Sequence, residues 1–439
     1  MKKLLSLLLT SALLLTMAGC SDNTSVSSDV SKDSSTADES VASDSTPESS
    51  ADTDTSAEST SAIESTPESE VDFSTLSEEE IYDLMVERSL MTTGDMTRMA
   101  NVLKRAQNGE TINVSYIGGS ITEGYMGGTE DIFATAATNW LGEQFPSATF
   151  NCINAGISGT PSILGNIRLE RDILDHDPDI CFVEFAVNDG NAIQYKESYE
   201  SLVRTLLEQD KDIAVVLIFT VIKSGHTCQP HMSQIGEHYG LPMISLPDSI
   251  GVEFADGRMT WEEYSDDESH PNPYGHKIIT DFIANYYENV IPTIDDNAGE
   301  VSKTLPEPIF SGRFAHTHYI DSEDLEPTLV GFVENDTHSS FHNGWMYKGK
   351  EEASFSFTIN CKSLQMIYKA NKSKAFADAD IYIDGELKMT VSSNLSDGWN
   401  NPVTAILIDS DEVAEHTVEI RLNGGTIQYF GILGFGYCD

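Results

Sequence analysis

Three residues of the chain carry the side chains that nucleophilic serine chemistry needs. Ser120 follows two glycines, and Asp267 and His270 form an Asp-x-x-His pair far downstream. A serine hydroxyl is a weak nucleophile until a base removes its proton, and the pKa range of histidine suits that base. The aspartate can accept the second imidazole N–H and fix the tautomer of the ring. The pattern therefore predicts acyl transfer, provided that the fold brings these side chains together.

The elements that must position them alternate between strand and helix. Near-continuous apolar runs of strand length are separated by segments with helical periodicity, which is typical of a parallel sheet covered on both faces. We therefore predict a three-layer α/β/α domain over residues 73–293. The expected strands are 113–117, 149–154, 179–187, 213–221 and 243–246, and the expected helices lie near 77–105, 132–143, 163–176, 195–209, 232–239 and 275–290.

The candidate residues fall on loops at one edge of this sheet. Ser120 follows the first expected strand, Gly159 the second and Asn188 the third, and the Asp-x-x-His pair comes just before the last helix. Parallel sheets place ligands at the carboxyl ends of their strands, beside helix N-termini. We therefore expect a hydroxyl, backbone amides, a side-chain amide and an Asp/His pair at one edge.

These four segments resemble blocks I, II, III and V of the SGNH (GDSL-like) hydrolase superfamily, in the same order and with similar spacing. The resemblance implies a flavodoxin-like fold, with Ser120 as nucleophile, His270 as general base and Asp267 as its partner. It also implies an oxyanion hole formed by the backbone amides of Ser120 and Gly159 and the side chain of Asn188. It implies no cofactor and no metal.

Two positions depart from the usual family pattern. Gly119 stands where Asp is usual, which matches the Gly-Gly-Ser-Ile-Thr variant, and Ala186 stands where Gly is commoner. Neither change removes a group that takes part in proton transfer or oxyanion binding. The Gly-x-Ser-x-Gly elbow of other α/β-hydrolases is absent from the sequence, which disfavours that relative.

Each candidate residue also has an ordinary structural alternative. Ser120 could be a helix N-cap, Gly159 a turn glycine and His270 an exposed loop histidine. A metal site formed by Asp267, His270 and His276 is of suitable type, but one Asp-x-x-His is too little for zinc. We favour the catalytic hypothesis, because without it a separate structural explanation would be needed for each candidate residue, and all of these explanations would have to hold together.

After the α/β domain the pattern changes. Residues 294–308 are polar and contain prolines, as expected of a linker. Residues 309–439 carry short alternating runs separated by turn signals, which predict an antiparallel β-sandwich of jelly-roll type. Trp345, Trp399 and Tyr429 could form a sugar-stacking platform, although the core is the commoner place for aromatic residues of short strands.

The N-terminus has the features of an export signal. Residues 1–20 combine two lysines, an apolar run too short to span a bilayer and a Met-Ala-Gly-Cys end that resembles a bacterial lipobox. Cys20 is therefore expected to carry lipid and to anchor an extracellular protein to the cell membrane. Residues 21–72 are almost wholly Ser, Thr, Asp, Glu, Ala and Pro, which predicts a disordered tether or a partner-binding tail. Cys361 and Cys438 could pair, which the sequence leaves open.

The net charge of −46 disfavours nucleic acid and anionic membrane surfaces as partners, because both would repel the chain. SGNH blocks joined to a β-sandwich resemble carbohydrate acetylesterases, so we expect an extracellular O-acetyl esterase that acts on a polysaccharide. The alternatives are a lipase, lysophospholipase or thioesterase of the same superfamily and a non-catalytic glycan-binding lipoprotein. No obligate protein partner is inferred.

Overall fold

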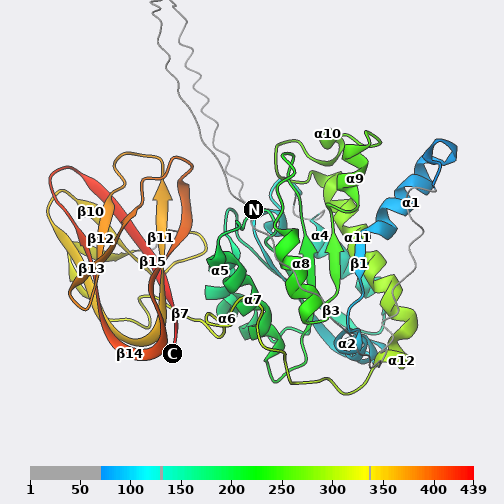
Figure 1. Cartoon of the computed structure of the whole chain (residues 1–439), viewed down its shortest axis with the longest axis horizontal. Helices are drawn as coiled ribbons and strands as arrows, with labels where there is room; N and C mark the ends of the chain where they lie inside the picture. The colour runs from blue at the N-terminus through cyan, green and yellow to red at the C-terminus, as the bar shows by residue number, and fades with distance from the viewer. Residues whose placement is uncertain (1–70, 129–131, 336–337) are drawn as a thin grey trace, which may run out of the picture. The chain divides into compact units, whose positions relative to one another are not determined.

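The computed structural model describes residues 71–128, 132–335 and 338–439 (Figure 1). The predicted export signal with Cys20, and the tether up to Glu70, lie outside the described residues. Within the described ranges, no helix is long and apolar enough to cross a membrane. An α/β part is followed by an all-β part, as the sequence predicts.

Among the described residues, the α/β part contains a six-stranded sheet in the order β1-β6-β5-β4-β2-β3. Its strands are β1 (Leu90–Thr92), β2 (Thr111–Gly118), β3 (Thr149–Gly156), β4 (Ile180–Glu184), β5 (Ala214–Phe219) and β6 (Met243–Ser245). Strands β2 to β6 run parallel. Their order confirms the flavodoxin-like prediction, and its switch point lies between β2 and β4.

The first strand differs from the prediction. The sequence pattern predicts helix over residues 77–105, whereas the structure has α1 (Glu78–Arg88) and α2 (Thr97–Gln107) with β1 between them. Ser77 begins α1 in a capping box with Glu80. β1 pairs antiparallel with β6 at the edge of the sheet. A strand of three residues is too short to show an alternating pattern in the sequence.

Alternate residues of the strands belong to two apolar clusters, one on each face of the sheet. In β4, Ile180 and Phe182 belong to one apolar cluster, and Cys181 and Val183 to another. The first cluster includes α1, α2, α4 (Phe133–Gln144), α9 (Ile250–Ala255), α10 (Trp261–Tyr264), α11 (Pro273–Val290) and α12 (Ile294–Asn297). The second includes α6 (Leu169–Asp172), α7 (Ile193–Leu207) and α8 (Gln229–His238). The α/β/α prediction is confirmed.

The β part is an antiparallel sandwich around one apolar core. Its strands are β7 (His318–Ile320), β8 (Thr328–Val330), β9 (Phe332–Asn335), β10 (Gly344–Gly349), β11 (Ala353–Asn371), β12 (Asp378–Ile383), β13 (Glu386–Ser392), β14 (Trp399–Leu422) and β15 (Gln428–Cys438). Register shifts interrupt the pairing of β11 with β14, and the two ends of β11 pair with different neighbours, β8 and β15. Cys361 and Cys438 are buried free thiols and do not form a disulfide.

Polar contacts join the two parts along α7. The carboxylate of Glu200 accepts the backbone N–H groups of residues 309–311 at 2.6 to 3.0 Å. Arg313 then pairs with Glu197 of α7 and with Asp409 of β14, each at 2.5 Å. Beside these contacts, α5 (Ser162–Ile167) packs into an apolar cluster with residues of the β part. The sandwich is therefore packed against the α/β part by specific contacts.

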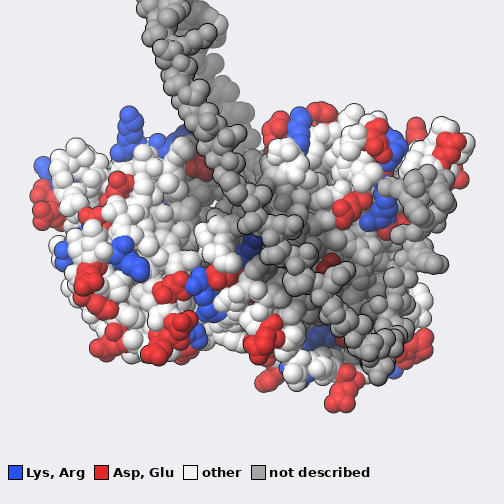
Figure 2. Space-filling model, viewed as in Figure 1, with Lys and Arg blue, Asp and Glu red and all other residues white. Residues whose placement is uncertain are grey.

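Acidic side chains are distributed over both parts on the face seen in Figure 2, with Lys and Arg interspersed among them. The charge of the described residues is therefore not confined to one acidic patch on this face. Such a surface keeps a protein soluble and resists association with polyanions.

Candidate active site

Ser120 stands where β2 ends and a single helical turn begins. β2 is buried along most of its length, and α3 (Ser120–Glu123) starts directly after Gly119, which occupies the N-cap position. The role of helix cap, the structural alternative for the serine, is therefore taken by its neighbour. Gly124, in the left-handed conformation, ends the turn. The backbone thus holds the Ser120 hydroxyl at the carboxyl edge of the sheet.

The three side chains predicted to act together form one hydrogen-bonded chain. His270 Nε2 lies 2.9 Å from Ser120 Oγ, and His270 Nδ1 lies 2.7 Å from Asp267 Oδ2. Asp267 Oδ1 accepts the backbone N–H groups of Ser269 and His270, both at 2.7 Å. Burial alone would raise the pKa of Asp267, but these hydrogen bonds outweigh it and hold the pKa below its ordinary value. With its proton on Nδ1, His270 presents Nε2 as an acceptor to the serine.

Side chains that the sequence did not single out hold the loop that carries the pair. Trp261 Nε1 donates to the Asp267 carbonyl at 2.5 Å, and the Ser265 hydroxyl donates to the His270 carbonyl at 2.6 Å. The ring of Tyr125 lies edge-to-face on the His270 imidazole, with 4.6 Å between the ring centroids. These contacts fix the imidazole ring in place. None of the three residues belongs to a recognised motif, so no sequence signal indicated them.

Gly159 and Asn188 lie around the same turn. A Cβ at Gly119 would lie only 2.1 Å from the amide oxygen of Asn188, so the Asn188 side chain fills the space beside the residue before the serine. The Asn188 side chain therefore provides a steric reason for glycine at position 119, where the family usually has aspartate. Gly159 has a φ of 70°, which favours glycine. Its loop is tied to α3 because the backbone N–H of Ser158 donates to the Glu123 carboxylate at 2.9 Å.

Two buried ionisable side chains form hydrogen bonds at the strand ends that carry the site. Glu184, at the end of β4, accepts the hydroxyls of Thr122 and Thr220 at 2.9 and 2.6 Å, and its burial raises its pKa. Arg168 donates to the carbonyl of Gly118, which ends β2, at 3.0 Å and to the carbonyl of Ala155, one residue before the end of β3, at 2.6 Å. Both groups fix the ends of the strands that carry the site. One sequence signal existed for Glu184, which is a lone acidic residue inside an apolar strand.

Asp189, the neighbour of Asn188, is a buried carboxyl group that makes stability depend on pH. Its Oδ1 accepts the backbone N–H of Ser162 at 2.7 Å, and burial raises its pKa to about 7. Because this pKa exceeds the ordinary value of 3.8, the folded protein keeps a proton that the unfolded chain has already released. The contribution of Asp189 to stability should therefore fall as the pH rises from about 4 to about 7 and should stay constant above that range.

The variant Asp189→Asn should remove this pH dependence, because asparagine cannot ionise. As the pH rises to about 7, we expect the free energy of unfolding of the variant to increase relative to that of the parent. The increase should be at most about 1.4 kcal/mol per pH unit. Urea unfolding at several pH values measures this difference. Asp266→Asn, at an exposed position, is the matched control. A constant difference between Asp189→Asn and the parent would contradict the prediction.

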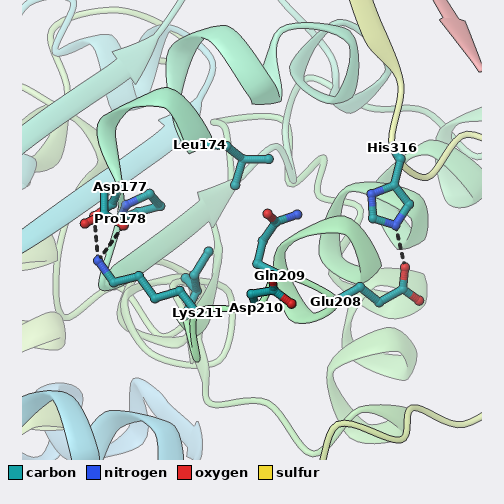
Figure 3. Close-up of a pocket in the computed structure, with 9 residues that line it drawn as sticks. Leu174, Asp177, Pro178, Glu208, Gln209, Asp210, Lys211 and His316 are labelled. Carbon is teal, nitrogen blue, oxygen red and sulfur yellow. Dashed lines mark hydrogen bonds and ion pairs between the residues drawn. The ribbon is translucent and has the colours of Figure 1, made fainter.

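Within the described residues, no group of three or more His, Cys, Asp or Glu side chains is arranged to hold a metal ion. A cavity of about 450 Å³ lies where β4 and β5 begin, at the edge opposite the serine (Figure 3). In it Lys211 pairs with Asp177, and His316 pairs with Glu208. None of the candidate catalytic residues lines this cavity.

Comparison with known proteins finds a family match for part of the chain. Residues 116–278 match the GDSL-like Lipase/Acylhydrolase family. Two crystal structures of a two-domain esterase (CEX) active on acetylated mannans, one of them co-crystallized with mannopentaose, each share 27% sequence identity with the chain at a TM-score of 0.73. They cover 81% of this chain and 98% and 99% of their own chains. A search among curated proteins found no match.

The family match over residues 116–278 and the likeness to the two-domain esterase support an enzyme that hydrolyses ester bonds. The structural likeness covers more of the chain than the α/β part alone, so it includes the β-sandwich. The chain therefore resembles a two-domain carbohydrate esterase in both of its parts.

Proposed function

We propose that the protein is a serine esterase that removes O-acetyl groups from a polysaccharide. The observation that carries the proposal is the continuous hydrogen-bonded chain from Asp267 through His270 to Ser120 at the carboxyl edge of the sheet. The substrate class is supported by the likeness to an esterase active on acetylated mannans.

The mechanism follows from the proposed roles of these groups. His270 Nε2 takes the proton of Ser120 Oγ as the oxygen attacks the acetyl carbonyl carbon. The backbone N–H groups of Ser120 and Gly159 and the Asn188 amide stabilise the resulting oxyanion. Collapse of the intermediate expels the sugar alkoxide, which takes the proton from His270. Water, activated by the same base, then cleaves the acetyl-serine to acetate and restores the hydroxyl.

The test is release of acetate by purified protein from acetylated mannan, xylan and exopolysaccharide, measured beside a series of esters of increasing acyl length. Turnover of acetylated glycans with a preference for short acyl groups supports the proposal. Preference for long acyl esters would assign a lipase-type or thioesterase function to the same site. Glycan binding without hydrolysis of any ester would mean that the chain is a binding protein.

We propose further that the protein is exported and anchored outside the cell by lipid on Cys20. The support is the Lys-Lys start, the apolar run and the Met-Ala-Gly-Cys end of residues 1–20. Cys20→Ser should shift the protein from the membrane fraction to the soluble fraction and abolish incorporation of a labelled fatty acid. Cys152→Ser, which alters a cysteine outside the signal, is the control. A parent protein found in the soluble fraction without label would contradict this proposal.

A further inference from the structure

The structure separates the three aromatic residues that the sequence offered as a sugar platform. Trp345 is fully buried, edge-on against Phe355, and Tyr429 stacks on Phe376 within the β part. Trp399, the first residue of β14, is 55% exposed. Trp399 alone of the three presents a broad aromatic surface to solvent.

The exposed indole of Trp399 borders the candidate active site. A Cβ at Gly159 would lie 3.3 Å from Trp399 Cζ2, so the indole lies in contact range of the Gly159 backbone. The loop that carries Gly159 is bonded to Glu123, in the helical turn that Ser120 begins. The β part therefore places one of its side chains at the rim of the site in the α/β part.

The backbone around Trp399 holds the ring in this exposed position. Asn400 adopts a left-handed φ of 80°, and its side chain accepts a hydrogen bond from the Asn371 amide at 2.8 Å. The Asn401 side chain accepts the Trp399 N–H at 3.0 Å. Gly398 packs closely on Asn371, where a Cβ would lie 2.6 Å from the Asn371 Cα. A non-glycine residue in such a conformation persists only where its surroundings determine it, and such residues gather at ligand sites.

A second exposed aromatic residue lies beside the proposed general base. Tyr125 is 52% exposed, its ring contacts the His270 imidazole, and its N–H donates to the Ser120 carbonyl at 3.0 Å. Tyr125 beside the base and Trp399 beside Gly159 thus both border the candidate site. Two exposed rings at one reactive centre differ from scattered surface aromatics and form a binding surface.

We propose that Trp399 determines the specificity of this site for carbohydrate esters, an inference that rests on the proposed esterase function. The indole stacks on the apolar C–H face of a sugar ring and thereby holds the acetyl group of that sugar, or of its neighbour, at Ser120. A small ester without a ring cannot use this contact. The β part therefore contributes binding energy to glycan esters that it does not contribute to simple acetates.

The experiment compares kcat/KM on acetylated manno-oligosaccharides and on ethyl acetate for the parent, Trp399→Ala and Trp399→Phe. We expect Trp399→Ala to lower the ratio of the two kcat/KM values about ten-fold, mainly through KM on the oligosaccharide. Trp399→Phe should retain most of the ratio, because it keeps an aromatic face. Val413→Ala, at an exposed position of the same strand, is the matched control and should leave the ratio unchanged.

Binding measured without turnover provides a second readout. In the Ser120→Ala background, Trp399→Ala should weaken binding of the acetylated oligosaccharide by a similar factor in calorimetry. An unchanged affinity, an unchanged ratio or equal losses on both substrates would overturn the role of Trp399. A parent protein that hydrolyses ethyl acetate but no acetylated glycan would instead overturn the proposed substrate class, and this inference with it.

Discussion

Ser120→Ala is expected to lower kcat for acetate release by about 10⁴-fold or more. The substitution removes the oxygen that lies 2.9 Å from His270 Nε2, so the base loses the group that it would activate. Substrate binding and the oxyanion-binding groups remain, and they account for the residual rate. Ser120 is not the cap of α3, so alanine removes no capping hydrogen bond. Acetate release from an acetylated glycan, with thermal unfolding to verify the fold, is the measurement.

Ser410→Ala, at an exposed position of the β part, is the control for this variant and should behave as the parent does. A folded Ser120→Ala protein with activity within ten-fold of the parent would show that another group is the nucleophile. Oligosaccharide binding by the inactive variant would separate loss of chemistry from loss of the substrate site.

Asp267→Asn is expected to reduce kcat/KM by about 10⁴-fold, the loss found when the corresponding aspartate of a serine protease is changed to its amide. The Asp267 carboxylate accepts from Nδ1 of His270 and from two backbone N–H groups. An asparagine that keeps the backbone contacts turns an N–H donor toward Nδ1, and this favours the tautomer in which Nε2 carries the proton. That tautomer cannot accept the proton of Ser120.

The pKa of Asp267 lies below its ordinary value, so the parent keeps this carboxylate ionised at neutral and alkaline pH. The loss in Asp267→Asn should therefore persist across the whole active pH range and should not be recovered by raising the pH. Asp266→Asn changes the neighbouring exposed residue in the same way and should remain active. A loss smaller than ten-fold in Asp267→Asn, or full recovery at high pH, would contradict the assigned role.

The fold was predictable where a long segment repeats one pattern. The apolar run around Cys181 to Val183 marks a strand buried on both faces, and the structure sends alternate residues of this run into two helical layers. β1 was not predictable, because Leu90 to Thr92 is stabilised by pairing with β6 and not by any local preference. Pairing with a strand so distant in sequence produces no recognisable pattern in a segment of three residues.

The residues of the site likewise include some that the sequence predicts and others that it does not. Ser120, Asp267 and His270 are recognisable from side-chain chemistry and motif spacing, and the structure brings them within hydrogen-bond distance of one another. The places of Arg168 and Trp399 depend on how remote segments pack. Arg168 resembles an ordinary helical arginine in the sequence, yet its side chain is fully buried under two strand ends. Trp399 reaches the site only because the β part packs on the α/β part.

The contact between Gly119 and Asn188 has a consequence for how this sequence can change over generations. Each residue occupies space that the other would need if it were enlarged or moved, because a Cβ at Gly119 would overlap the Asn188 amide. Residues 119 and 188 are therefore expected to covary, although they lie in separate blocks. A larger residue at position 119 requires that the Asn188 amide take another position.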